Sequence, residues 1–168
     1  MAIRYWVGGT SADASDAANW SSSSGGSGGS APGTSDTAVL DGATSLKTIS
    51  EVKASANQLV SSSHGFSTED PVWIESSENV LPSPLAERTT YYVISVNSNT
   101  ISLATSSSNA AAGTAIDITD DGLETLKIRK VTYCMLPDGF DVSSIEIHST
   151  FAGTMVMMSA AVTVRKGL

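Results

Sequence analysis

Short runs of β-favouring residues, separated by turn residues, recur along most of this chain. Residues 90–96 (TYYVISV) form the clearest run, because aromatic and β-branched residues dominate it. The turn residues 97–99 (NSN) follow, and residues 100–104 (TISLA) are predicted to return as the second strand of a hairpin. Further runs lie at residues 3–7, 37–40, 47–52, 58–60, 72–75, 116–118, 126–133, 144–148, 154–158 and 161–165. Strands of this length and spacing predict an all-β fold with a short-stranded scaffold: a sandwich, a barrel or a solenoid-like stack of strands.

Residues 21–32 (SSSSGGSGGSAP) interrupt the strand pattern with a low-complexity stretch that is flexible by composition. Apolar β-favouring residues resume at 37–40 and end at an Asp-Gly turn at 41–42. We therefore predict that residues 21–32 form a long surface loop within one structure, and not a linker between two.

The charge balance excludes several classes of partner. The chain carries 17 acidic and 9 basic side chains, for a net charge of −8. We expect no nucleic-acid partner, because phosphate backbones repel an acidic surface and the densest basic group, Lys127, Arg129 and Lys130, is too small to be a basic patch.

The first residues lack a signal-peptide pattern, and no apolar stretch approaches the roughly 20 residues that span a bilayer, so we expect no membrane partner. Cys134 is the single cysteine, so no internal disulfide is expected.

Two regions carry a resemblance to known proteins. Residues 4–9 (RYWVGG), 17–21 (AANWS), Pro32 and 35–41 (SDTAVLD) resemble the N-terminus of many tailed-phage virion proteins, and a related order begins bacterial β-helical surface proteins. The middle of the chain is similar to a small β-module of phage tail and head proteins, found distantly in ubiquitin-activating enzymes. The residues that carry this second resemblance are 63–66 (SHGF), 70–72 (DPV), 81–82 (LP), 89–94 (TTYYVI), 101–105 (ISLAT) and 113–118 (GTAIDI).

The resemblance implies a nested architecture, with residues 1–52 and 126–168 as the β-scaffold and residues 53–125 as an inserted small β-barrel-like module. It also implies a non-enzymatic structural role in a virion, assembled in the host cytoplasm. Because the chain given is short, a head decoration or cement protein is the leading expectation, bound in many copies to the major capsid protein. Homo-oligomers are expected for such proteins, and a trimer is one such state. The alternatives are a tail, adaptor or receptor-facing virion subunit, and a carbohydrate-binding module.

Candidate catalytic side chains are few. His64 lies in a predicted turn, His148 ends a predicted strand two residues after Glu146, and Cys134 lies between apolar neighbours. No nucleophile elbow or Cys/His signature accompanies them. We therefore expect no enzyme, no catalytic residue and no cofactor, with Cys134 a buried, inert thiol.

Residues 117–122 (DITDDG) imitate the first half of an EF-hand loop, with oxygen ligands at its first, third and fifth positions and glycine at the sixth. The twelfth position is Ile128, where a bidentate Glu is required, although Glu124 lies nearby. Flanking helices are not predicted, and no Cys/His cluster suggests zinc. A capped hairpin turn is therefore the favoured interpretation, and no metal site is predicted.

The aromatic residues are the better candidates for partner contacts. Trp73 alternates with Val72 and Ile74, so it faces outward if those two face the core, and an outward Trp suits a protein or sugar partner. A half-buried packing role for Trp73 is the alternative. The full set of candidate contacts is Trp73, Tyr91, Tyr92, Trp6 and Trp20, of which the first three form a candidate platform for glycan stacking and the last two are also expected to fix the Gly/Ser-rich loop to the scaffold.

Overall fold

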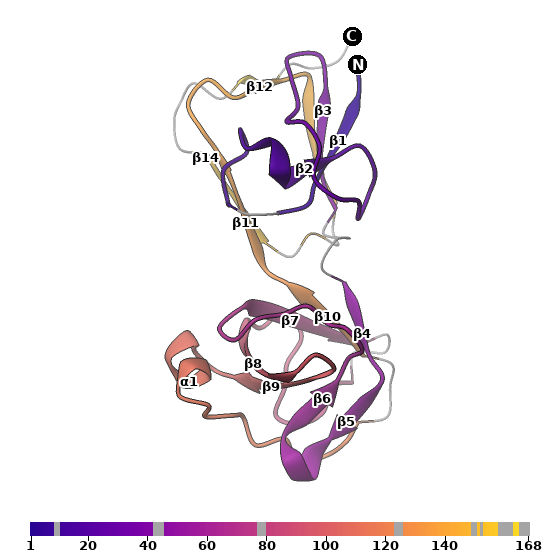
Figure 1. The fold of residues 1–168 in the computed structure, drawn as a ribbon, viewed down its shortest axis with the longest axis vertical. Helices are drawn as coiled ribbons and strands as arrows, with labels where there is room; N and C mark the ends of the chain where they lie inside the picture. Colours follow the sequence, from indigo (N-terminus) through magenta and orange to yellow (C-terminus); the bar gives the residue numbers. More distant parts are fainter. Residues whose placement is uncertain are drawn as a thin grey trace. The chain divides into compact units, whose positions relative to one another are not determined.

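In the residues that it describes, the computed structural model consists mainly of short strands joined by turns and loops, with one short α-helix (Figure 1). It describes residues 1–8, 11–41, 46–76, 80–122, 126–148, 151, 153–157 and 163–164. The prediction of an all-β fold is confirmed.

The chain divides into two compact units, which are described separately. Unit 1 comprises residues 1–45 and 132–168, and unit 2 comprises residues 46–131. Unit 2 thus begins at residue 46 and not at 53, and it ends at residue 131 and not at 125. The reason is that β4 (Lys47–Ile49) and β10 (Leu126–Lys130) pair with each other inside the sheet of unit 2, with Leu126 opposite Ile49.

Unit 1 is a stack of short parallel strands. Within unit 1, the strands that follow β3 are β11, β12, β13, β14 and β15, in that order. Three of the strands pair in parallel with the third strand after them: β3 with β13, β11 with β14 and β12 with β15. This is the path of a coil whose successive turns lie on one another, as in a β-solenoid. The N-terminal residues add a partial turn at the other end of the stack. There β1 pairs in parallel with β3, and Asp13 forms a parallel bridge with Met135. The strands of unit 1 are β1 (Ile3–Trp6), β2 (Trp20–Ser21), β3 (Thr37–Leu40), β11 (Thr132–Leu136), β12 (Asp141–Val142), β13 (Ser144–Ile147), β14 (Gly153–Met157) and β15 (Thr163–Val164).

Aromatic side chains fill the core of unit 1. The ring centroids of Trp6 and Trp20 lie 5.2 Å apart in an edge-to-face arrangement, and Phe140 stacks on Trp20 at 6.3 Å. The Trp20 indole N–H also donates a 2.7 Å hydrogen bond to the carbonyl of Ala14, so this buried polar atom is satisfied. Leu40 and Cys134 are among the buried residues that pack in the same cluster.

The first turn of the stack is covered by the Gly/Ser-rich region. Strand β2 runs antiparallel to β1, with Trp20 opposite Trp6, and is the last strand of its sheet. The chain then loops back, and the backbone N–H of Gly29 donates to the carbonyl of Trp20. Residues 21–32 therefore form a surface loop within unit 1 that packs against the segment preceding it, in place of a free linker.

Unit 2 contains a seven-stranded antiparallel sheet in the order β4-β10-β7-β8-β9-β6-β5. The two outermost strands, β4 and β5, are separated only by Ser50, whose backbone N–H donates to the carbonyl of Val60 in β6 at 2.8 Å. A bent strand that pairs at both edges is what closing a sheet into a barrel requires; the barrel-like module itself stays a prediction. The remaining elements of unit 2 are β5 (Glu51–Lys53), the 3-10 helix Ala54–Ala56, β6 (Gln58–Val60), β7 (Pro71–Ser76), β8 (Tyr91–Asn97), β9 (Thr100–Ala104) and α1 (Ser107–Ala111).

The hairpin predicted from residues 90–104 is present as β8 and β9, with Asn97 opposite Thr100 across the turn. Val93 and Leu103 are paired and buried in the core of unit 2, together with Val72 and Ile74 of β7. Residues between these inward positions point to the other face of the sheet, because side chains alternate along a strand. Helix α1 packs against β8 and β9 (Figure 1).

The packing of the Gly/Ser-rich loop predicts a difference between two of its glycines. A Cβ atom at Gly28 would lie 2.5 Å from the backbone oxygen of Ala18, whereas a Cβ atom at Gly33 would meet no atom within 4 Å. Gly28→Ala should therefore destabilise unit 1 by about 1–3 kcal/mol, as overpacking does, while Gly33→Ala should change stability by less than about 1 kcal/mol. Denaturant unfolding followed by tryptophan fluorescence measures both, and equal effects would show that the loop is not packed.

Candidate functional site

The five predicted contact aromatics separate into buried and surface positions. Trp6 and Trp20 are 2% and 0% exposed in the core of unit 1, so their assignment as partner contacts is wrong. Their rings are needed to fill the centre of the stack. Their other predicted role agrees with the packing, because the Gly/Ser-rich loop is hydrogen-bonded to the backbone of Trp20.

Tyr91 is also wrongly assigned as a contact residue. It is 6% exposed and belongs to the core of unit 2, on the same side of β8 as Val93. Its phenol oxygen accepts a 2.8 Å hydrogen bond from the backbone N–H of Ala86 and so fixes the segment before β8. The next residue, Tyr92, takes the opposite side of the strand because of the alternation.

Trp73 and Tyr92 form the aromatic part of the outward face of the unit 2 sheet. Both are half-buried, and they lie on neighbouring strands, since Pro71 of β7 is opposite Tyr92 of β8. The Trp73 indole N–H donates a 3.1 Å hydrogen bond to the hydroxyl of Thr90, which fixes the plane of the ring. We call Trp73, Thr90 and Tyr92, together with the ion pair described next, the aromatic face.

An ion pair borders Trp73 on its other side. Arg129 of β10 is opposite Trp73 in the register, and its guanidinium Nη2 lies 2.6 Å from a carboxylate oxygen of Glu75. The Arg129 side chain is only 5% exposed and that of Glu75 is 31% exposed. The sequence indicates only that Arg129 belongs to a small basic group with Lys127 and Lys130. Its burial depends on the pairing of β7 with β10, which are separated by some fifty residues.

The aromatic face is suited to contact chemistry. A half-buried indole held by a hydrogen bond offers a rigid apolar surface, and the neighbouring hydroxyl and carboxylate oxygens offer hydrogen-bonding partners at its rim. This combination fits the surface of a protein or the ring of a sugar.

The two histidines lie in different units. His64 is 3% exposed in unit 2, its Nδ1 accepts from the backbone N–H of Phe66 at 2.9 Å, and its Nε2 lies 2.7 Å from the carbonyl oxygen of Asn97. Both ring nitrogens therefore hold the loop after β6. His148 is exposed in unit 1, at the end of β13.

Cys134 is fully buried in the core of unit 1, as predicted. Burial raises the pKa of its thiol to about 12. Because the thiolate is the reactive form, this cysteine is inert at neutral pH.

The acidic turn at residues 117–122 uses its carboxylates to bind backbone groups. The Asp120 side chain accepts hydrogen bonds from the N–H groups of Ser83 and Gly122, each at 3.0 Å, and Asp121 accepts one from Ala54 at 2.8 Å. In the described part of the chain, no group of three or more His, Cys, Asp or Glu side chains is arranged to hold a metal ion. The geometry of this turn agrees with a capped loop.

Unit 1 carries an open pocket of about 290 Å³ between the loop around Pro32 and the turn at residues 137–141. Phe140 lines the pocket, and its buried ring rests on Trp20. Asp138 and Asp141 also line it. Its mixed apolar and acidic lining is a secondary candidate for contact with a partner.

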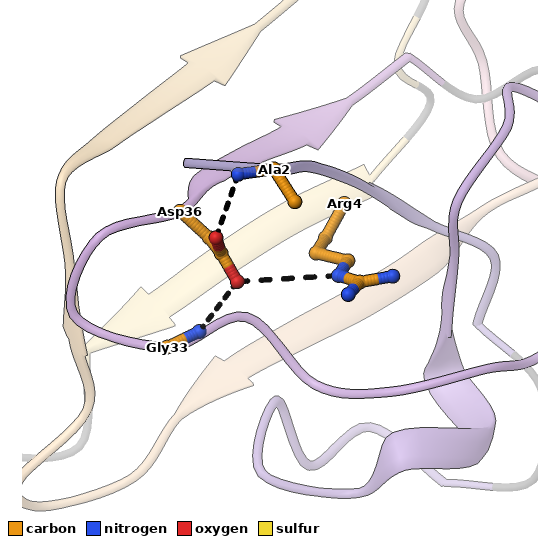
Figure 2. A network of polar contacts seen from close by, with 4 residues as sticks. All are labelled: Ala2, Arg4, Gly33 and Asp36. Atoms are coloured by element: carbon orange, nitrogen blue, oxygen red, sulfur yellow. Dashed lines mark hydrogen bonds and ion pairs between the residues drawn. The ribbon is translucent and has the colours of Figure 1, made fainter.

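A carboxylate joins the beginnings of β1 and β3 (Figure 2). Asp36 accepts hydrogen bonds from the backbone N–H of Ala2 at 2.8 Å and of Gly33 at 3.2 Å, and the Arg4 Nε lies 4.0 Å from it. These backbone hydrogen bonds, assisted by the charge of Arg4, lower the pKa of Asp36 below its usual value. The contact is structural, because it aligns two neighbouring parallel strands.

Comparisons of the chain with protein-family models, with curated proteins and with solved structures found no match. Across the residues whose placement is described, no helix combines the length and the apolar character needed to cross a membrane.

The Asp36 contact predicts an acid-sensitive contribution to the stability of unit 1. A folded-state pKa below the unfolded value of about 3.8 means that this contribution is fully present above that pH and is lost as the pH falls through the folded pKa. Asp36→Asn should lower the free energy of unfolding by about 1–3 kcal/mol at pH 7, and the difference from the parent chain should shrink below pH 4. Denaturant unfolding at several pH values measures this. Asp117→Asn, at an exposed carboxylate of unit 2, is the control, and a difference that does not depend on pH would contradict the assignment.

Proposed function

We propose that the chain is a non-enzymatic structural component of a tailed-phage virion. The observation that carries the proposal is the covered start of the parallel strand stack in unit 1. It is formed by the residues that resemble the beginning of phage virion proteins and of β-helical surface proteins. In this region Trp20 lies in the core and the Gly/Ser-rich loop lies over the first turn.

The fold supports a scaffold role on physical grounds. Stacked parallel turns bury a continuous core with very short strands, and each turn is held by its neighbours. His64 and Cys134, two of the side chains with catalytic potential, hold or fill the interior. The outward-facing side chains suited to contact a partner are those of the aromatic face.

Two locations in the virion follow from this role. As a head decoration protein, the chain would bind the major capsid protein in many copies, and binding to the assembled shell would stabilise the lattice by mass action. Repetition over a symmetric shell makes a modest contact sufficient. A tail or receptor-facing subunit is the second candidate, favoured by the parallel stack, and in that setting the aromatic face would contact a surface glycan.

The aromatic face provides a test of both candidates. Trp73→Ala should weaken binding to purified shells of the encoding phage at least tenfold, because it removes the rigid centre of the face. Tyr133→Ala is the matched control, since Tyr133 is an exposed aromatic residue of unit 1. Sedimentation of the protein with shells, together with the melting temperature of the shells, gives the readout.

A decoration protein should bind shells with fixed stoichiometry and raise their melting temperature. Binding to purified tails, or retention on a column of host polysaccharide that Trp73→Ala abolishes, would favour the receptor-facing candidate. Failure to bind shells, tails and polysaccharide alike would overturn the virion proposal.

A further inference from the structure

Among the described residues, the interior of the unit 1 stack ends on an exposed apolar side chain. In the parallel register, Leu40 of β3 is opposite Ile147 of β13. Leu40 is fully buried in the core, and Ile145, two residues before Ile147 on the same side of β13, packs against that core. Ile147 therefore occupies the next interior position of the ladder, yet it is 53% exposed. An exposed isoleucine in line with the interior of the ladder gives a further strand at this edge an apolar side chain to contact.

Among the residues that the structure describes, no strand pairs with the outer side of the backbone at this position. β13 is the outermost strand of its sheet, and within the described ranges β14 and β15 each pair on one side only. The N–H of His148 points to β3, where it donates to the carbonyl of Leu40 at 2.9 Å. Because backbone groups alternate in direction along a strand, the N–H and C=O of Ile147 point away from β3, toward the open edge.

The opposite end of the stack cannot provide the missing strand. There β2 reverses direction beside β1, and the Gly/Ser-rich loop is hydrogen-bonded to β2. A second copy of the chain can therefore pair with the open edge through its own β13, but not through its first turn. Contact between identical edges is isologous and closes at two copies.

The residues around Ile147 fit such a contact. If two β13 strands run antiparallel about Ile147, this residue is opposite its own copy, and Glu146 is opposite His148 of the second copy in both directions. Glu146 and His148 are both exposed, and a carboxylate opposite an imidazole is a favourable cross-strand pair. The two exposed Ile147 side chains cover each other at the end of the two cores.

We propose that the last turn of the stack is a self-association edge, at which two copies of this chain join by antiparallel pairing of β13 about Ile147. The proposal goes beyond the virion role and does not depend on it. The two Ile147 residues then exchange both of their outward backbone hydrogen bonds.

Disulfide trapping tests the proposed register. Residues in a hydrogen-bonded antiparallel pair have Cα atoms about 5.5 Å apart, within the range of roughly 4.4–6.8 Å that a disulfide spans. Ile147→Cys in the full chain should therefore give a disulfide-linked dimer under mild oxidation. Ile3→Cys is the matched control, because Ile3 is a 50% exposed isoleucine in β1 of the same sheet and should not crosslink. The buried thiol of Cys134 does not compete.

Analytical ultracentrifugation tests the association without a crosslink. Ile147→Asp should raise the dissociation constant of the dimer at least tenfold, since it places two carboxylates opposite each other. Glu146→Lys should also weaken the dimer, and adding His148→Glu should restore it by recreating opposite charges. A chain that sediments as a monomer at every concentration, equal crosslinking of the Ile3→Cys control, or a trimer that survives Ile147→Asp would overturn the proposal.

Discussion

The parallel ladder between β3 and β13 is the contact on which the rest of unit 1 depends. It joins residues more than a hundred positions apart, as in the 2.9 Å hydrogen bond between the hydroxyls of Thr37 and Ser144. The stack cannot form its second turn until these strands meet. Closing so long a loop costs conformational entropy that a few strand residues do not easily offset.

Unit 2 reduces that cost because its own ends are paired. β4 begins just after residue 45 and β10 ends just before residue 131, and the two lie side by side in the sheet, with Ile128 opposite Lys47. A folded insert whose first and last strands are neighbours behaves as a short connection between β3 and β11. The pairing of β4 with β10 therefore has two consequences. It extends unit 2 beyond the expected residues 53–125, and it lowers the entropic cost of inserting this unit between β3 and β11.

Local patterns in the sequence predicted most of the strands but not their partners. Residues 116–118 form no strand, and the run predicted at 126–133 divides into β10 of unit 2 and β11 of unit 1. The β8–β9 hairpin and the outward phase of Trp73 follow from alternation and turn residues alone. Alternation alone does not show which of Tyr91 and Tyr92 faces the core, because two adjacent aromatic residues suit either side of the strand. The choice is settled only when a neighbour such as Val93 is known to be buried. Burial of Trp20 and Arg129 depends on pairings between distant segments, which a single sequence does not display. The choice of a stack over a sandwich or barrel for unit 1 has the same origin.

The Ser, Thr and Gly content acquires a physical meaning in this structure. A coil with strands of two to five residues has many turns, and each turn leaves backbone groups that short polar side chains can bind. In the loop after β2, Gly28 lies against the backbone of Ala18 and Ser24 donates to the carboxylate of Asp41 at 2.5 Å. Small residues therefore allow this segment to pack closely over the first turn of the stack, although its composition predicts a flexible loop. Among the described residues, no comparable segment covers Ile147 in the last turn, so the two ends of the stack differ in how their apolar side chains are covered.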